Sequence, residues 1–342
     1  MYSRSAGYGL QQFVNIGQLG SGKIFVVGDS ATADEDMLKE LFGYDPDGTL
    51  RFFDDIDEAV GHCTANAGDK ILVMAGHAET ITAASGIDLD VAGISLIGLG
   101  VGSDRPTITF TTAVTADMDF GADNLYIKNI VFINGIDGLD EPLDIEASVD
   151  FVTFEDCEFR DDTASMQTDR WIQTAATNTN LKLINCKHVG SDTAGAVAFI
   201  TITGGSNHVI DGLVSNGDFS AGNIELLTTL TGDILITNCI LENANAVDVN
   251  IEGNSLSSTG WIKDTMCRLA TNGQTTWVNN VGAITIYNSF GADNSGEAGQ
   301  RIGTANASSI EDDVNEILTD TGTTIPATIT TIDGFHDVPS AD

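Results

Sequence analysis

The chain has 342 residues, a length beyond which a single globular core usually stops growing, so we expect either two domains or a repeat architecture. Asp and Glu total 50 against 14 Lys and Arg, a formal net charge of −36. This charge excludes the basic surface needed to coat nucleic acid or to dock on anionic lipid, so we expect no nucleic acid and no membrane among the partners. A hydrophobic content of 42% is enough to bury a core and excludes wholesale disorder.

Residues 1–65 are expected to be an N-terminal strand-and-helix segment that caps the rest of the chain and attaches it to a partner. A strand is predicted at 23–29, and two short amphipathic helices at 34–43 and 54–63. In the second helix Asp54 or Asp55 is the expected N-cap, and the apolar face comprises Ile56, Ala59, Val60 and Cys63. The first 13 residues lack the apolar stretch of a secretory signal, so we expect a protein that is not exported.

Residues 66–295 are predicted to form one repeat array. Its clearest part is a set of segments from about residue 125 onward, each carrying one Asn or Asp at intervals of 24 to 29 residues. These corner residues are Asn129, Asp156, Asn185, Asp211, Asn238, Asp264 and Asn288. The residue two positions before each corner is apolar: Ile127, Phe154, Leu183, Val209, Ile236, Ile262 and Ile286. The pattern predicts coils of short strands closed by a turn at the corner, because Asn and Asp tolerate a left-handed backbone.

If successive coils stack about 4.8 Å apart, the corner residues lie above one another and can hydrogen-bond along the stack. The position after the corner holds Cys157, Cys186 and Cys239, which predicts a buried column where Cys serves as a compact apolar side chain. A disulfide or metal site between Cys157 and Cys186 is the alternative, although no His supports it. The five Cys form no CxxC pair and the five His show no metal-ligand spacing, so we expect no cofactor and no metal.

The repeat resembles the right-handed parallel β-helix of the pectin-lyase-like kind. Two earlier stretches, at 69–81 and 94–110, fit the repeat less regularly and resemble the first coils of such proteins. The resemblance covers about residues 69–291 and implies an all-β fold of about nine coils, with a capping segment before it and a short helix and tail after it. It does not imply one activity, because this fold hosts lyases, hydrolases, adhesins and viral spikes.

A carbohydrate-active enzyme would need a cationic base or a group of carboxylates on one face, and resemblance to pectate lyases suggests an Arg as that base. The candidate bases are Arg105, Arg160, Arg170 and Arg268. The nearest acidic group in sequence is Asp161, Asp162 and Asp169, and the aromatic side chains for stacking on sugar are Trp171, Trp261 and Trp277. With 50 acidic residues such groups arise by chance, so no catalytic residue is assigned.

Residues 296–342 are expected to be a C-terminal helix and tail, with the helix at 308–318. The stretch 317–334 resembles segments common in bacteriophage structural proteins, where they act as oligomerisation elements. From these resemblances we expect a virion structural protein, most simply a capsid decoration, head fibre or turret. The same resemblances imply a homotrimer that contacts the major capsid protein or another virion protein, with a host-surface glycan as a further partner. The alternative is a tail spike or a carbohydrate-active β-helix enzyme.

Overall fold

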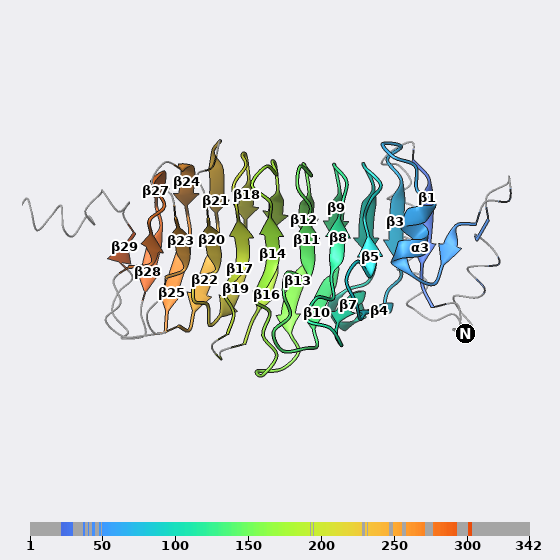
Figure 1. Ribbon diagram of the computed structural model, residues 1–342, viewed down its shortest axis with the longest axis horizontal. Coiled ribbons are helices and arrows are strands. Elements are labelled where there is room, and N and C mark those ends of the chain that lie inside the picture. The colour runs from blue at the N-terminus through green and yellow to red at the C-terminus, as the bar shows by residue number, and fades with distance from the viewer. Residues whose placement is uncertain are drawn as a thin grey trace, which may run out of the picture.

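The computed structural model describes residues 22–29, 50–191, 193, 195–227, 230, 232–245, 249–254, 258–270, 276–292 and 300–302, together with residues 37, 40, 43, 44 and 48. These residues form an elongated stack of rungs (Figure 1). The predicted helices at 34–43 and 308–318 and the tail at 317–334 lie outside the described residues, apart from single positions in the first of them.

The described strands form three sheets that run along the stack. The eleven-stranded sheet contains, in spatial order, β2 (Phe52–Phe53), β1 (Ile24–Val27), β3 (Lys70–Val73), β6 (Ser95–Gly98), β9 (Tyr126–Lys128), β12 (Thr153–Glu155), β15 (Lys182–Ile184), β18 (Val209–Asp211), β21 (Ile234–Thr237), β24 (Thr259–Lys263) and β27 (Ala283–Tyr287). The ten-stranded sheet contains β4 (Ala78–Ile81), β7 (Thr107–Phe110), β10 (Val131–Asn134), β13 (Glu158–Asp161), β16 (Lys187–Val189), β19 (Val214–Gly217), β22 (Ile240–Asn243), β25 (Met266–Leu269), β28 (Phe290–Ala292) and β29 (Gln300–Arg301). The eight-stranded sheet contains β5 (Ile87–Asp88), β8 (Met118–Phe120), β11 (Leu143–Ile145), β14 (Arg170–Thr174), β17 (Ala198–Ile202), β20 (Ile224–Leu226), β23 (Ile251–Gly253) and β26 (Val278–Asn279).

Each coil contributes one strand to each sheet in turn, and pairs such as β12 with β15 and β13 with β16 are parallel. From β3 onward this gives eight complete coils and a ninth that contains β27 and β28. Strands of two to five residues suffice because period-2 alternation sends every second side chain into the interior. The expectation of an all-β parallel β-helix of about nine coils is confirmed.

The interior is filled by apolar side chains, with aromatic rings stacked from coil to coil. Phe132 and Phe159 stack at a centroid distance of 5.2 Å, and Phe159 meets Phe199 at 5.2 Å in the next coil. His188 continues the row, 4.6 Å from Phe199. Stacked rungs place like residues above one another, so each ring gains burial and favourable ring–ring geometry together.

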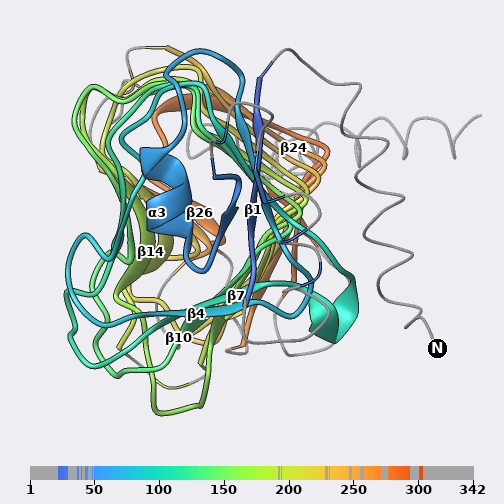
Figure 2. The same cartoon turned by 90° about the vertical axis from the view of Figure 1, so that its right-hand side faces the viewer.

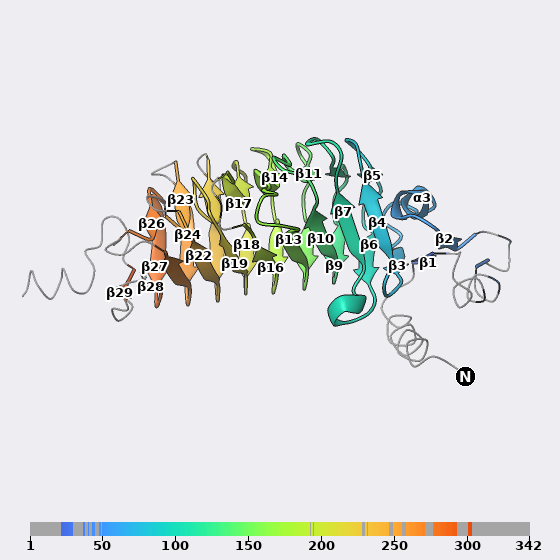
Figure 3. The same cartoon turned by 90° about the horizontal axis from the view of Figure 1, so that it is seen from below.

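The described N-terminal residues close one end of the stack. Strand β1 pairs with β3 and so extends the eleven-stranded sheet by one rung. Helix α3 (Ile56–Gly61) lies over this end, opposite the end that carries β29 (Figures 2 and 3). Its N-cap is Asp55, whose carboxylate accepts from the Glu58 N–H at 2.7 Å, and Ile56, Ala59 and Val60 are buried. Covering the first coil removes bare core from solvent, as a repeat stack requires.

The chain contains a further short helix inside a turn. The 3-10 helix η1 (Gly102–Asp104) connects β6 to β7. No helix in the described residues is both long enough and apolar enough to span a bilayer.

Candidate functional site

The corner residues form a column along the stack, and they share a left-handed backbone conformation. Positive φ values occur at Asn129, Asp156, Asn185, Asn238, Asp264 and Asn288. Corner amides donate to a carbonyl of the next coil, as from Asn185 to Asp211 and from Asn238 to Lys263. Side chains add bonds along the column, such as that from Nδ2 of Asn238 to Oδ1 of Asp211 at 2.8 Å.

The sixth coil departs from the predicted alignment by one residue. Asp211 lies in β18 opposite Thr237, and Gly212, with a φ of +72°, takes the corner position between Asn185 and Asn238. The prediction of Asp211 as a corner residue is therefore wrong by one position. The cause is physical: a corner needs a residue that accepts a left-handed backbone, and Gly meets that need as well as Asn does. The inward apolar residue of this coil is consequently Ile210, which is buried, and not Val209.

The position after the corner is buried in every aligned coil. Cys157, Cys186 and Cys239 are free thiols there, and each donates to a carbonyl of its own coil and to one of the coil before. Burial raises the pKa of Cys157 and of Cys239 to about 12 and raises that of Cys186 as well. Thiols held in this way are inert, so these cysteines pack the stack together and offer no nucleophile.

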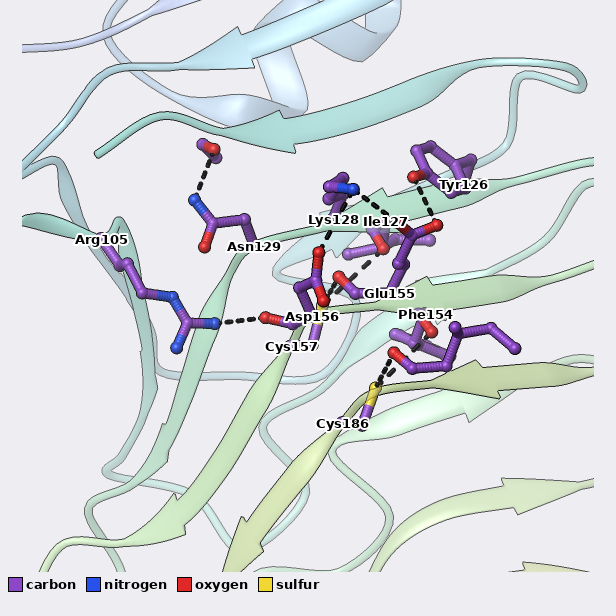
Figure 4. Close-up of polar contacts among 12 residues, drawn as sticks. Arg105, Tyr126, Ile127, Lys128, Asn129, Phe154, Glu155, Asp156, Cys157 and Cys186 are labelled. Carbon is purple, nitrogen blue, oxygen red and sulfur yellow. Dashed lines mark hydrogen bonds and ion pairs between the residues drawn. The ribbon is translucent and has the colours of Figure 1, made fainter. Parts of the chain in front are cut away.

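Beside the corners of the third and fourth coils a polar network ties coils to one another (Figure 4). Lys128 pairs with Glu155 and, at 3.2 Å, with Asp156, while the Tyr126 hydroxyl donates to Glu155 at 2.8 Å. The hydrogen bond to Glu155 raises the pKa of Lys128, and the same pair lowers the pKa of Glu155. Arg105 clamps two coils by donating to the carbonyl of Asp156 at 2.6 Å.

The other predicted arginines also point to carboxylates. Arg105 and Arg160 both lie within 3.5 Å of Glu158, and Arg268 lies 3.6 Å from Glu242. Because each guanidinium has an acidic partner, none of these arginines presents an uncompensated cation that could polarise a substrate.

The outer face of the eight-stranded sheet carries a second column, which the sequence pattern does not predict. Its members face one another in register: Asp88, Asp119, Asp144, Gln173, Thr201, Glu225, Glu252 and Asn279. Thr201 and Glu225 are buried, and the other members are half-buried. A weak signal is present in the sequence, because most of these residues stand between two apolar ones, as in Met118–Phe120 and Leu143–Ile145. It is hard to detect because the intervals vary from 24 to 31 residues and no single residue type recurs.

The first coils make this column acidic. Asp88, Asp119 and Asp144 occupy adjacent rungs, and Asp117 lies two residues before Asp119. Burial, followed by the charge of Asp119 and a hydrogen bond with it, raises the pKa of Asp117 to about 6. Burial and neighbouring carboxylates also raise the pKa of Asp88 and of Asp144. Burial and the nearby charge of Asp119 both disfavour the ionised form of Asp117, so its carboxyl keeps its proton to a higher pH than an ordinary Asp does.

Further along the column, polar side chains from neighbouring rungs bond to one another. Nε of Arg170 donates to Oγ1 of Thr201 at 3.0 Å and lies 3.6 Å from Glu225, and Nη1 lies 3.1 Å from Asp169. Thr201 donates in turn to Glu225 at 2.8 Å. This network spans three rungs, so Arg170 acts as a brace between coils.

The remaining residues considered for catalysis do not converge. Asp161 is held by Thr168 at 3.0 Å and by the amide of Ser191 at 2.9 Å, whereas Asp169 pairs with Arg170. Trp171 and Trp277 are buried, and Trp261 is exposed on the eleven-stranded sheet, not on the acidic one. Among the described residues no group of three or more His, Cys, Asp or Glu side chains is placed to hold a metal ion.

Comparisons with known proteins support the fold. No family model matches the chain, and no curated protein matches it in sequence. Among solved structures, the pectin methylesterase from Aspergillus niger in deglycosylated form is similar, with a TM-score of 0.52 and 15% sequence identity, over 81% of this chain and 87% of that one. A likeness at this identity shows a shared right-handed parallel β-helix and no more.

Proposed function

We propose that the chain is a structural protein of a bacteriophage particle, displayed on the capsid as a decoration, head fibre or turret. The observation that carries this proposal is that the polar groups of the stack bond from coil to coil. Arg105, Arg170 and the corner residues each tie at least two rungs together. Nine coils at about 4.8 Å per rung give a stiff rod roughly 45 Å long.

The charge supports the same proposal. A net charge of −36 keeps the surface soluble and apart from packaged DNA. The resemblance of 317–334 to phage oligomerisation segments adds a homotrimer and a contact with the major capsid protein to the proposal. The host-surface glycan is the partner that an exposed knob would meet.

Mass spectrometry of purified particles tests this function. We expect the chain in the particle at a fixed ratio to the major capsid protein, as decoration requires. A few copies per particle would move the assignment to the tail, and absence from the particle would reject a virion role altogether.

The second candidate function is a carbohydrate-active enzyme, and one observation favours it. Asp119 and Asp144 face each other on adjacent rungs of one sheet, and Asp117, whose pKa is raised to about 6, lies two residues before Asp119. Glycan hydrolysis uses two carboxyl groups on one face, one of them with a raised pKa that lets it act as the acid. The shared fold with a pectin methylesterase fits this alternative at the level of architecture.

Incubation with neutral and acidic polysaccharides, including methyl-esterified pectin, separates the two candidates. The structural proposal expects no release of sugar or methanol above a buffer blank. Release that is lost in Asp119→Asn, but kept in Asp233→Asn on the far side of the stack, would establish the enzyme instead. Asp233 is a suitable control because it is exposed and belongs to the eleven-stranded side, where it accepts from Thr259.

A further inference from the structure

The ten-stranded sheet exposes an apolar column in its last four rungs. Val214, Ile240, Met266 and Phe290 are the first residues of β19, β22, β25 and β28 and face one another in register. Their exposed fractions are 43%, 50%, 44% and 39%. In the two preceding rungs the same register holds Glu158 and Lys187, so the apolar column is confined to the end of the stack far from α3.

Single exposed apolar residues are ordinary on protein surfaces, but four in consecutive rungs form a continuous strip. At about 4.8 Å per rung the strip is roughly 14 Å long. Side chains that alternate with it, such as Leu241 and Cys267, point inward and are buried, so the strip is not part of the core.

The chain leaves the described structure beside this strip. Strand β29 runs antiparallel to β28, with Arg301 opposite Phe290, and the amide of Ile302 donates to the carbonyl of Ser289 at 3.0 Å. The last described residue, Ile302, therefore lies next to the Phe290 end of the apolar column, at the end of the stack where Figure 3 shows β28 and β29. Residues 303–342 come after it in the sequence.

One stretch of that segment has apolar residues whose spacing matches the spacing of the strip. Ile310, Val314 and Ile317 are spaced by four and three residues, so a helix at 308–318 places them on one face. The helical pitch of about 5.4 Å is close to the rung spacing of about 4.8 Å, so successive turns fall over successive rungs. The connection 303–309 reaches up to about 23 Å, more than the length of the strip.

The area of the strip favours this occupant over a second copy of the chain. Four partly exposed side chains offer on the order of 300 Å² of apolar surface, well below the roughly 800 Å² per partner that a stable interface buries. A tethered helix needs less area because its local concentration is high.

We propose that residues 308–318 form a helix that packs along the apolar column of the same chain, covering Val214, Ile240, Met266 and Phe290. In this position the helix shields the apolar side chains of the last four rungs from solvent. The tail beyond residue 318 then starts from a fixed place on the ten-stranded sheet.

Disulfide trapping in the full-length chain tests this packing. In a Cys63→Ser background, whose four remaining cysteines are buried, Met266→Cys is combined with Val314→Cys and oxidised at low protein concentration. We expect an intrachain disulfide, seen as a faster band on a non-reducing gel and as a linked peptide by mass spectrometry. Val114→Cys with Val314→Cys is the matched control, since Val114 is 45% exposed but lies near the other end of the stack, between β7 and β8.

Three outcomes would overturn the proposal: disulfides only between chains, which would assign the strip to a second copy; equal trapping in the control; or no disulfide. Hydrogen exchange on the full chain gives a second measurement that does not depend on oxidation. Amides of 310–318 should be protected, and Ile240→Asn should reduce that protection at least tenfold while Val114→Asn leaves it unchanged. Equal protection in wild type and Ile240→Asn would contradict the packing.

Discussion

The corner at Asn238 gives a direct test of what holds the coils in place. Asn238 is exposed, has a φ of +54°, and bonds Asp211 through its side chain at 2.8 Å. A left-handed backbone costs an ordinary L-residue about 1–2 kcal/mol, and an exposed hydrogen bond contributes about 0.5–1 kcal/mol. Asn238→Ala should therefore lower the free energy of unfolding by about 1.5–3 kcal/mol.

Asn238→Gly loses the same hydrogen bond but not the backbone preference, because Gly adopts positive φ freely. We expect this variant to be more stable than Asn238→Ala by about 1 kcal/mol, although Gly also gains freedom in the unfolded chain. Urea denaturation followed by tryptophan fluorescence measures the difference, since Trp171 is buried in the aromatic row.

Asn216 provides the matched control for this comparison. It lies within β19 and has no positive φ, so there Gly should be less stable than Ala by about 0.5–1 kcal/mol. The order of the two substitutions thus reverses between the two sites. If Asn238→Gly were no more stable than Asn238→Ala, left-handed turn chemistry would not be what fixes the corners.

Three further predictions concern ionisation and the buried thiols. The pKa of Asp117 is raised to about 6 in the folded chain, so its proton is held between pH 4 and 6 and stability falls as the pH rises through that window. After allowance for solvent screening the loss is on the order of 1 kcal/mol, and Asp117→Asn should remove it from a profile of melting temperature against pH. Burial lowers the pKa of His188 to about 3, so stability falls as the pH drops from 6.5 toward 3, by up to about 4 kcal/mol. His188→Phe should flatten this acid arm of the urea midpoint, and an unchanged slope would exclude His188 as its source. Finally, a thiol reagent should label at most Cys63 in the native protein and all five cysteines in urea, because the other four are buried; rapid native labelling of Cys157 would mean that the column opens.

Much of the architecture could be predicted because its signals are local. A left-handed corner restricts the residue at that position to a few types, so Asn129, Asn185 and Asn288 mark the coils in the sequence itself. The same chemistry explains the one misplaced corner, since Gly212 meets the backbone requirement without an Asn or Asp side chain. The N-cap of α3 is likewise a local signal. The sequence predicts Asp54 or Asp55 at this position, and the structure has Asp55.

The two surface columns have at most a weak signal in the sequence, because they depend on how the coils stack. Asp88, Asp119 and Asp144 become neighbours only because the variable turns between them bring three strands into register. Val214 and Phe290 are far apart in the chain, and each alone is an ordinary apolar residue at the start of a strand. Backbone preferences act over a few residues and can therefore be predicted from the local sequence. Proximity across rungs is set by the sum of all the turns, and so only the folded stack decides which side chains share a face.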